Sequence, residues 1–174
     1  MGPVLLIYFG IGSILSIIIN IIVYLFSIKK KEVISIGKII SRLIFVGYLI
    51  MLILVTLIMN YNPSIVEKSN LIPFVDILNN IKLYGLFNGL NQFGLNVIMF
   101  IPMGILLPII FKKKNWNFKF ALFISFAITF AIEIMQFFTG RAADIDDVIA
   151  NTIGGAVGYL VYNVIYKLIL HHKN

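Results

Sequence analysis

The chain has 174 residues, of which 60% are apolar and only 12% are charged. Soluble domains carry about 45–50% apolar and about 25% charged residues, so this composition predicts an integral membrane protein. The absence of cysteine excludes thiol catalysis, disulfides and thiolate metal sites. His171 and His172, the only histidines, lie at the C-terminal end, so we expect neither a Ser-His-Asp triad nor a histidine metal site.

Five stretches are long and apolar enough to cross a membrane, since about 20 helical residues span the hydrocarbon core. They are residues 4–28, 43–59, 95–111, 120–138 and 146–170. The first lacks a basic N-terminal region and is too long for a cleaved signal peptide, so we interpret it as a span. We expect Pro102 and Gly104 to kink or thin the third span.

The longest piece between spans is residues 60–94, which we expect to form an external loop containing a short amphipathic helix near residues 72–81. The chain shows no internal repeat and no low-complexity linker. The sequence therefore predicts an all-α, polytopic membrane protein with about five transmembrane helices in a single domain, residues 1–174.

The basic residues predict the orientation of these spans. Only three of the 14 Lys and Arg residues, Lys68, Lys82 and Arg141, fall on one side of the predicted membrane. The positive-inside rule then places the N-terminus outside and the C-terminus in the cytoplasm. We interpret the net charge of +7 as the excess of Lys and Arg that sets the orientation of the spans, and we expect no nucleic-acid partner.

Polar residues within spans are informative because hydrocarbon makes them costly. Glu133 lies roughly 21 Å along its helix from Lys119, and Gln136 follows on the same face. Asp144, Asp147 and Asn151 recur every three or four positions at the start of the fifth span. Asn96 begins the third span, and Arg141 lies in the turn between the fourth and fifth spans. We therefore predict one outer-leaflet ligand-binding site that contains Asn96, Glu133, Gln136, Arg141, Asp144, Asp147 and Asn151.

Several of these residues also have a purely structural interpretation. Asp144 fits a helix N-cap, and Asp146 is expected to be a solvated acid in the first helical turn. Glu133 can form an ion pair with Arg141. Gly154, together with Ala150 and Gly158, forms a ridge of small residues that favours close helix packing and leaves open a homo-oligomer through Gly154 and Gly158.

Three stretches carry a family resemblance. They are Asn-Leu-Ile-Pro-Phe at 70–74, Asn-Val-Ile-Met-Phe-Ile-Pro-Met-Gly at 96–104, and Glu-Ile-Met-Gln at 133–136 followed by Arg141, Asp144, Asp147, Asn151 and Gly154. On these motifs the chain resembles the VanZ-like membrane protein family over roughly its C-terminal two-thirds. The resemblance implies a small, multi-pass protein of the bacterial cell membrane. Founding relatives lower susceptibility to the lipoglycopeptide teicoplanin, with little effect on vancomycin.

Two classes of function remain open. In the first, the site binds a polar head group without catalysis, and its partners are membrane lipids, a lipid-linked cell-wall precursor or a glycopeptide. Arg141 would then hold a phosphate or carboxylate. In the second, the chain is an enzyme on a lipid-linked cell-wall substrate, with Glu133 and Asp147 as its acid–base pair.

The enzyme hypothesis also allows Glu133, Asp144 and Asp147 to hold a divalent cation. No nucleophile motif accompanies the acids, and Thr139 and Thr152 are candidates only by proximity. We therefore assign no catalytic residue and expect no cofactor and no metal. A transporter is a weaker third hypothesis, because the chain lacks internal repeats.

Overall fold

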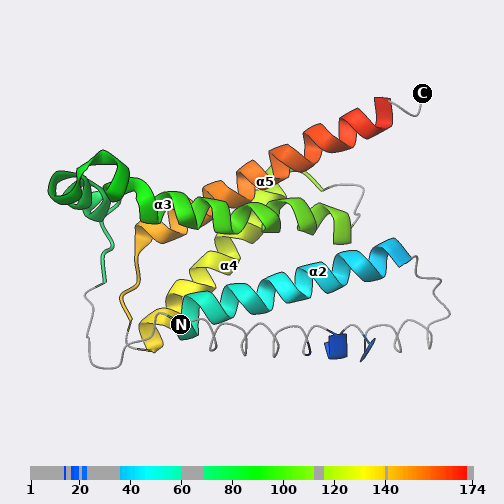
Figure 1. Ribbon diagram of the computed structural model, residues 1–174, viewed down its shortest axis with the longest axis horizontal. Helices are drawn as coiled ribbons and strands as arrows, with labels where there is room; N and C mark the ends of the chain where they lie inside the picture. Colours follow the sequence, from blue (N-terminus) through cyan, green and yellow to red (C-terminus); the bar gives the residue numbers. More distant parts are fainter. Residues whose placement is uncertain are drawn as a thin grey trace. The chain divides into compact units, whose positions relative to one another are not determined.

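The computed structural model (Figure 1) describes residues 14, 17–19, 21–22, 36–59, 69–111, 116–139 and 141–171. All regular secondary structure in these residues is helical, which confirms the all-α prediction. Four helices are long and apolar enough to cross a membrane, as expected of a polytopic membrane protein. The predicted first span, residues 4–28, lies largely outside the described residues, as do the basic residues at 29–31 and 112–114.

The chain divides into two compact units, Met1–Asn60 and Tyr61–Asn174. In the first unit, helix α2 (Ile36–Ile53) continues into a π-helical segment, η1 (Leu54–Met59). The hydroxyls of Ser41 and Thr56 each donate to the carbonyl four residues earlier, at 2.8 Å. These bonds satisfy the only polar hydrogens that those side chains carry, so the helix can lie in hydrocarbon.

The first helix described in the second unit is α3 (Val75–Phe111), which is interrupted at Gly85. Gly85 has φ 82° and ψ 165°, a backbone conformation that is essentially restricted to glycine. Helix therefore occupies much of the 60–94 region, where the sequence predicted a loop with one short helix. The break lies at Gly85, whereas α3 continues through Pro102 with helical backbone angles.

Helices α4 (Phe118–Phe138) and α5 (Ile145–His171) complete this unit, and α5 packs against both α3 and α4 (Figure 1). The α3–α5 contact depends on the ridge of small residues. A Cβ atom at Gly154 would meet the backbone carbonyl of Val97, and one at Gly158 would meet that of Ile101. Both glycines are thus buried against α3 of the same chain, where backbones approach closely.

Candidate functional site

The segment of residues 69–74, just before α3, lies against the chain that leads into α5. The Asn70 N–H donates to the Ala143 carbonyl, and the Ile145 N–H donates to the Asn70 carbonyl, both at 3.0 Å. The Ala143 N–H donates in turn to the Ser69 hydroxyl at 3.0 Å. The two backbone bonds make Asn70 and Asp144, which are distant in sequence, an isolated parallel bridge at the start of α5.

Asp146 holds the end of the same segment. Its Oδ1 accepts the Phe74 N–H at 2.6 Å, and Phe74 has a positive φ of 66°, which is uncommon for a residue other than glycine. Asp146 is only 4% exposed, so the prediction of a solvated acid is wrong. Asp146 is buried by a tertiary contact, because the 69–74 segment lies over the first turn of α5 and covers the carboxylate.

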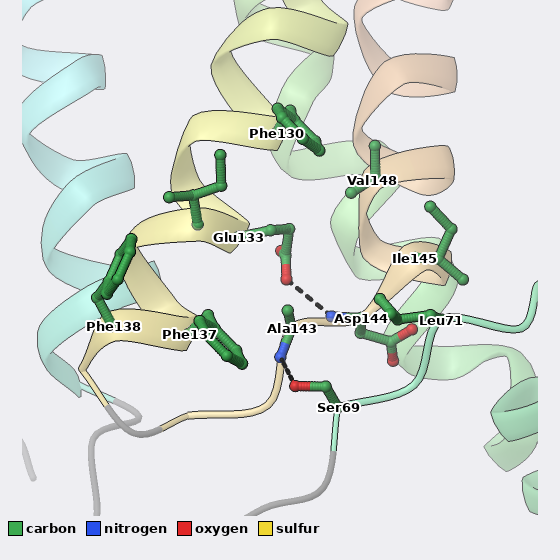
Figure 2. Close-up of a pocket in the computed structure, with 11 residues that line it drawn as sticks. Ser69, Leu71, Phe130, Glu133, Phe137, Phe138, Ala143, Asp144, Ile145 and Val148 are labelled. Atoms are coloured by element: carbon green, nitrogen blue, oxygen red, sulfur yellow. Dashed lines mark hydrogen bonds between the residues drawn. The ribbon is translucent and has the colours of Figure 1, made fainter.

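Glu133, on the last turns of α4, faces the N-terminus of α5. Its side chain is 5% exposed, and Oε2 accepts the Asp144 N–H at 2.9 Å (Figure 2). The Asp144 carboxylate accepts the Asp146 N–H at 2.8 Å, so Asp144 caps α5. The predicted cap is therefore present, and it is linked to Glu133.

The environment of Asp144 disfavours its charged form. Burial raises the pKa of this carboxyl above its usual range, and the carboxylates of Asp146 and Asp76 raise it further. The hydrogen bond from the Asp146 N–H acts in the opposite direction. The start of α5 is therefore a place where several acids crowd together.

Asp147 connects α5 to α3. Its Oδ1 accepts a hydrogen bond from the Asn96 amide at 2.5 Å, and Gln92, one turn earlier on α3, also lies within hydrogen-bonding reach. Arg141 is close enough to attract the carboxylates of both Glu133 and Asp147. The structure thus brings five of the seven predicted residues together at the start of α5: Asn96, Glu133, Arg141, Asp144 and Asp147.

The other two predicted residues lie in the interior between the helices. Asn151, one turn below Asp147, donates to the Thr129 hydroxyl at 2.8 Å and is 3% exposed. The Gln136 side chain is also buried, and its backbone carbonyl accepts the Arg141 N–H at 3.0 Å. Asn151 therefore belongs to a deeper polar contact between α4 and α5.

A cavity of about 430 Å³ opens beside Glu133 (Figure 2). Its walls are mostly aromatic and aliphatic, and the polar side chains come from Ser69 at one edge and from two acids. The lining residues are Ser69, Leu71, Phe130, Glu133, Ile134, Phe137, Phe138, Ala143, Asp144, Ile145 and Val148. Sequence reasoning missed the apolar walls and Ser69, because a phenylalanine in a membrane span carries no signal that separates a cavity wall from a lipid contact.

The hydroxyls near the acids are engaged elsewhere. Thr139 Oγ1 donates to the Gln136 carbonyl at 2.9 Å, and Thr152 Oγ1 donates to the Val148 carbonyl at 2.7 Å. Within the described ranges, no group of three or more His, Asp or Glu side chains is arranged to hold a metal ion.

The family model VanZ/LLP1 matches residues 44–166, which include α3, α4, most of α5 and every site residue named above. The chain belongs to the VanZ/LLP1 family. Protein VanZ of Enterococcus faecium, a relative, is 38% identical over 138 residues, which cover 75% of this chain and 78% of that protein. No solved structure matches the chain. The resemblance that the motifs predicted is thereby confirmed.

Proposed function

We propose that this VanZ/LLP1 protein resides in the bacterial cell membrane and lowers susceptibility to teicoplanin-type lipoglycopeptides. Its outer-leaflet polar site would act by engaging the head group of a lipid-linked molecule or of a cell-wall component. The observation that carries the proposal is the cavity beside Glu133, because its apolar walls adjoin the buried Glu133 and the half-buried Asp144.

This combination suits an amphiphilic ligand. Binding pockets are mostly apolar and contain a few polar groups that orient the ligand. Here, the phenyl rings of Phe130, Phe137 and Phe138 can contact a hydrocarbon chain, and two acids, Glu133 and Asp144, adjoin the same cavity. A ligand of this kind explains an effect on lipid-bearing glycopeptides that spares vancomycin.

The hydrogen bonds of the site favour binding over catalysis. Glu133 accepts a backbone N–H and Asp147 accepts the Asn96 amide, so both members of the candidate acid–base pair have structural partners. Thr139 and Thr152, the nearby hydroxyls, donate to carbonyls of their own helical turns. No described group adjoins the acids in the way that an activated nucleophile adjoins its base.

The test is antibiotic susceptibility in a Gram-positive host that carries the gene. Minimum inhibitory concentrations of teicoplanin and vancomycin are compared for the native chain, for Glu133→Gln, and for Asn79→Ala, an exposed position on α3. Glutamine can still accept the Asp144 N–H, so Glu133→Gln removes the charge and keeps the local fold. Protein levels in the membrane are checked by blot.

We expect the native chain and Asn79→Ala to raise the teicoplanin value selectively, and Glu133→Gln to lose this rise at an equal membrane level. A well-expressed native chain that leaves teicoplanin susceptibility unchanged contradicts the proposed function. A rise that persists in Glu133→Gln contradicts the assignment of this function to the site.

A further inference from the structure

Helix α3 folds back on itself at Gly85. A Cβ atom at Gly89 would meet the backbone of Ile81, and Gly89 is buried. Residues eight positions apart in a straight helix are separated by about 12 Å along its axis, so this contact requires a sharp bend between them. The positive φ of Gly85, 82°, provides the bend. Residues 75–84 therefore form the short arm of a hook, and residues 86–111 form its long arm (Figure 1).

The bend of the hook exposes large apolar side chains. Leu83, Tyr84, Leu86 and Phe87, which flank Gly85 in the sequence, are 73%, 64%, 66% and 92% exposed. We call these four residues the apolar tip. Contact between bulk water and so much apolar surface is unfavourable, and such exposed patches commonly mark an interaction site. The tip therefore needs an environment that is at least partly apolar.

The backbone at the bend excludes the hydrocarbon core as that environment. Gly85 is exposed, and open space surrounds the position of its Cβ. Lipid-exposed backbone that departs from a helix does not occur in the hydrocarbon region, because its polar groups find no water there. The Asn88 side chain donates to the Tyr84 carbonyl at 3.1 Å, and the side chain of Lys82, beside the bend, is exposed. These polar groups require that water reaches the bend.

The length of the long arm agrees with a position between water and hydrocarbon. Residues 86–111 measure about 39 Å at 1.5 Å per residue. The hydrocarbon core is about 30 Å thick, and the bilayer with its head groups is about 40–45 Å thick. Three lysines, residues 112–114, follow the long arm in the sequence and favour the head groups at that end. The bend at the other end then lies among the head groups of the opposite surface.

We propose that the apolar tip is an anchor that inserts into the interfacial zone of the lipid bilayer. Leu83, Leu86 and Phe87 contact the first part of the acyl chains, while Tyr84 and Lys82 lie among the head groups. The hook continues directly from the 69–74 segment, which lines one edge of the cavity, so the anchor holds that edge close to the membrane surface. This inference goes beyond the proposed function and does not depend on it.

Tryptophan fluorescence of the full chain in phosphatidylcholine vesicles measures the depth of the tip. Trp116 is the only tryptophan, and Trp116→Phe keeps an aromatic ring against Phe111. In this background Phe87→Trp reports the tip, and Ile98→Trp reports an exposed position about 16 Å further along the same helix. The lipids carry bromine, a quencher, either near the head-group end of the acyl chain or near its terminal methyl group. Acrylamide quenches from the water.

We expect Phe87→Trp to lose more fluorescence to the shallow bromine than to the deep bromine, and Ile98→Trp to show the reverse order. Leu86→Trp, a second position in the tip, should behave like Phe87→Trp and gives an independent measurement if Phe87→Trp lowers the yield of folded protein. The comparison with Ile98→Trp controls for the response of each quencher, because both tryptophans lie on α3.

Stronger quenching of the tip by the deep bromine places it in the hydrocarbon core and overturns the inference. Quenching by acrylamide alone places the tip in water, and protection from all three quenchers indicates that protein covers it. Both of these outcomes also overturn the inference. None of them changes the result of the teicoplanin test, so this inference and the proposed function fail separately.

Discussion

Asp146→Ala tests how the 69–74 segment is held against α5. The substitution removes the oxygen that accepts the Phe74 N–H at 2.6 Å, and it removes an acid from the first turn of α5. A hydrogen bond to a charged group contributes about 1.5–3 kcal/mol, and an acid at a helix N-terminus about 0.3–1 kcal/mol. The bond is only partly buried, so the freed N–H of Phe74 can reach water and the loss falls toward the lower end of this range.

We therefore expect local opening of the 69–74 segment to become easier by about 2 kcal/mol, or about 30-fold in the equilibrium constant. The effect should stay local, because the remaining contacts of α5 with α3 and α4 do not involve this carboxylate. The positive φ of Phe74 adds to the effect, since the segment relaxes once the bond is absent.

Amide hydrogen exchange of the full chain, followed by mass spectrometry, measures this opening. Peptides that cover residues 70–78 should exchange about 30-fold faster in Asp146→Ala, and peptides of α4 should exchange as in the native chain. Asp146→Asn keeps an acceptor oxygen and should show an intermediate effect. Unchanged exchange at 70–78, or equal acceleration throughout the chain, refutes the view that Asp146 holds this segment.

Thermal unfolding of the purified chain checks three further predictions. Gly154→Ala forces a Cβ onto the Val97 carbonyl and should lower the free energy of unfolding by about 1–3 kcal/mol. Gly94→Ala, which has open space around the new Cβ, should be neutral or stabilising. Equal effects at both sites would contradict the close α3–α5 contact. Gly85→Ala should cost about 1–3 kcal/mol because φ 82° strains any residue with a Cβ, and an unchanged unfolding temperature would refute this. The raised pKa of Asp144 means that the folded chain holds this proton more tightly than the unfolded chain, so its contribution to stability falls as the pH rises from the usual carboxyl range toward the raised value. Asp144→Asn keeps the cap and should remove that part of the pH dependence, and an identical pH profile in both proteins would count against it.

Much of the fold could be predicted from the sequence because hydropathy and helical period are local properties. The contact between Asn96 and Asp147 illustrates this, since the helix rise and the order of the spans were enough to predict that the two residues lie at a similar depth in the membrane. The link between Glu133 and the start of α5 has the same origin, because only a short turn separates α4 from α5.

The remaining features depend on contacts between distant segments. Burial of Asp146 requires the 69–74 segment to cross the N-terminus of α5, and no periodicity at Asp146 itself signals this. The break in α3 lies at Gly85 because its backbone adopts a conformation open to glycine, whereas proline was the more obvious signal in the sequence. The cavity walls likewise use phenylalanines that are indistinguishable in sequence from lipid-facing ones.

The most direct test of the account is the side of the membrane on which the site opens. The chain has no cysteine, so a single introduced cysteine reports its own position without background. Ser69→Cys lies at the edge of the cavity and Lys119→Cys at the opposite end of α4. We expect a membrane-impermeant maleimide to label Ser69→Cys in intact cells and Lys119→Cys only after permeabilisation. Labelling of Lys119→Cys in intact cells, with Ser69→Cys protected, would place the site on the cytoplasmic side and contradict the account.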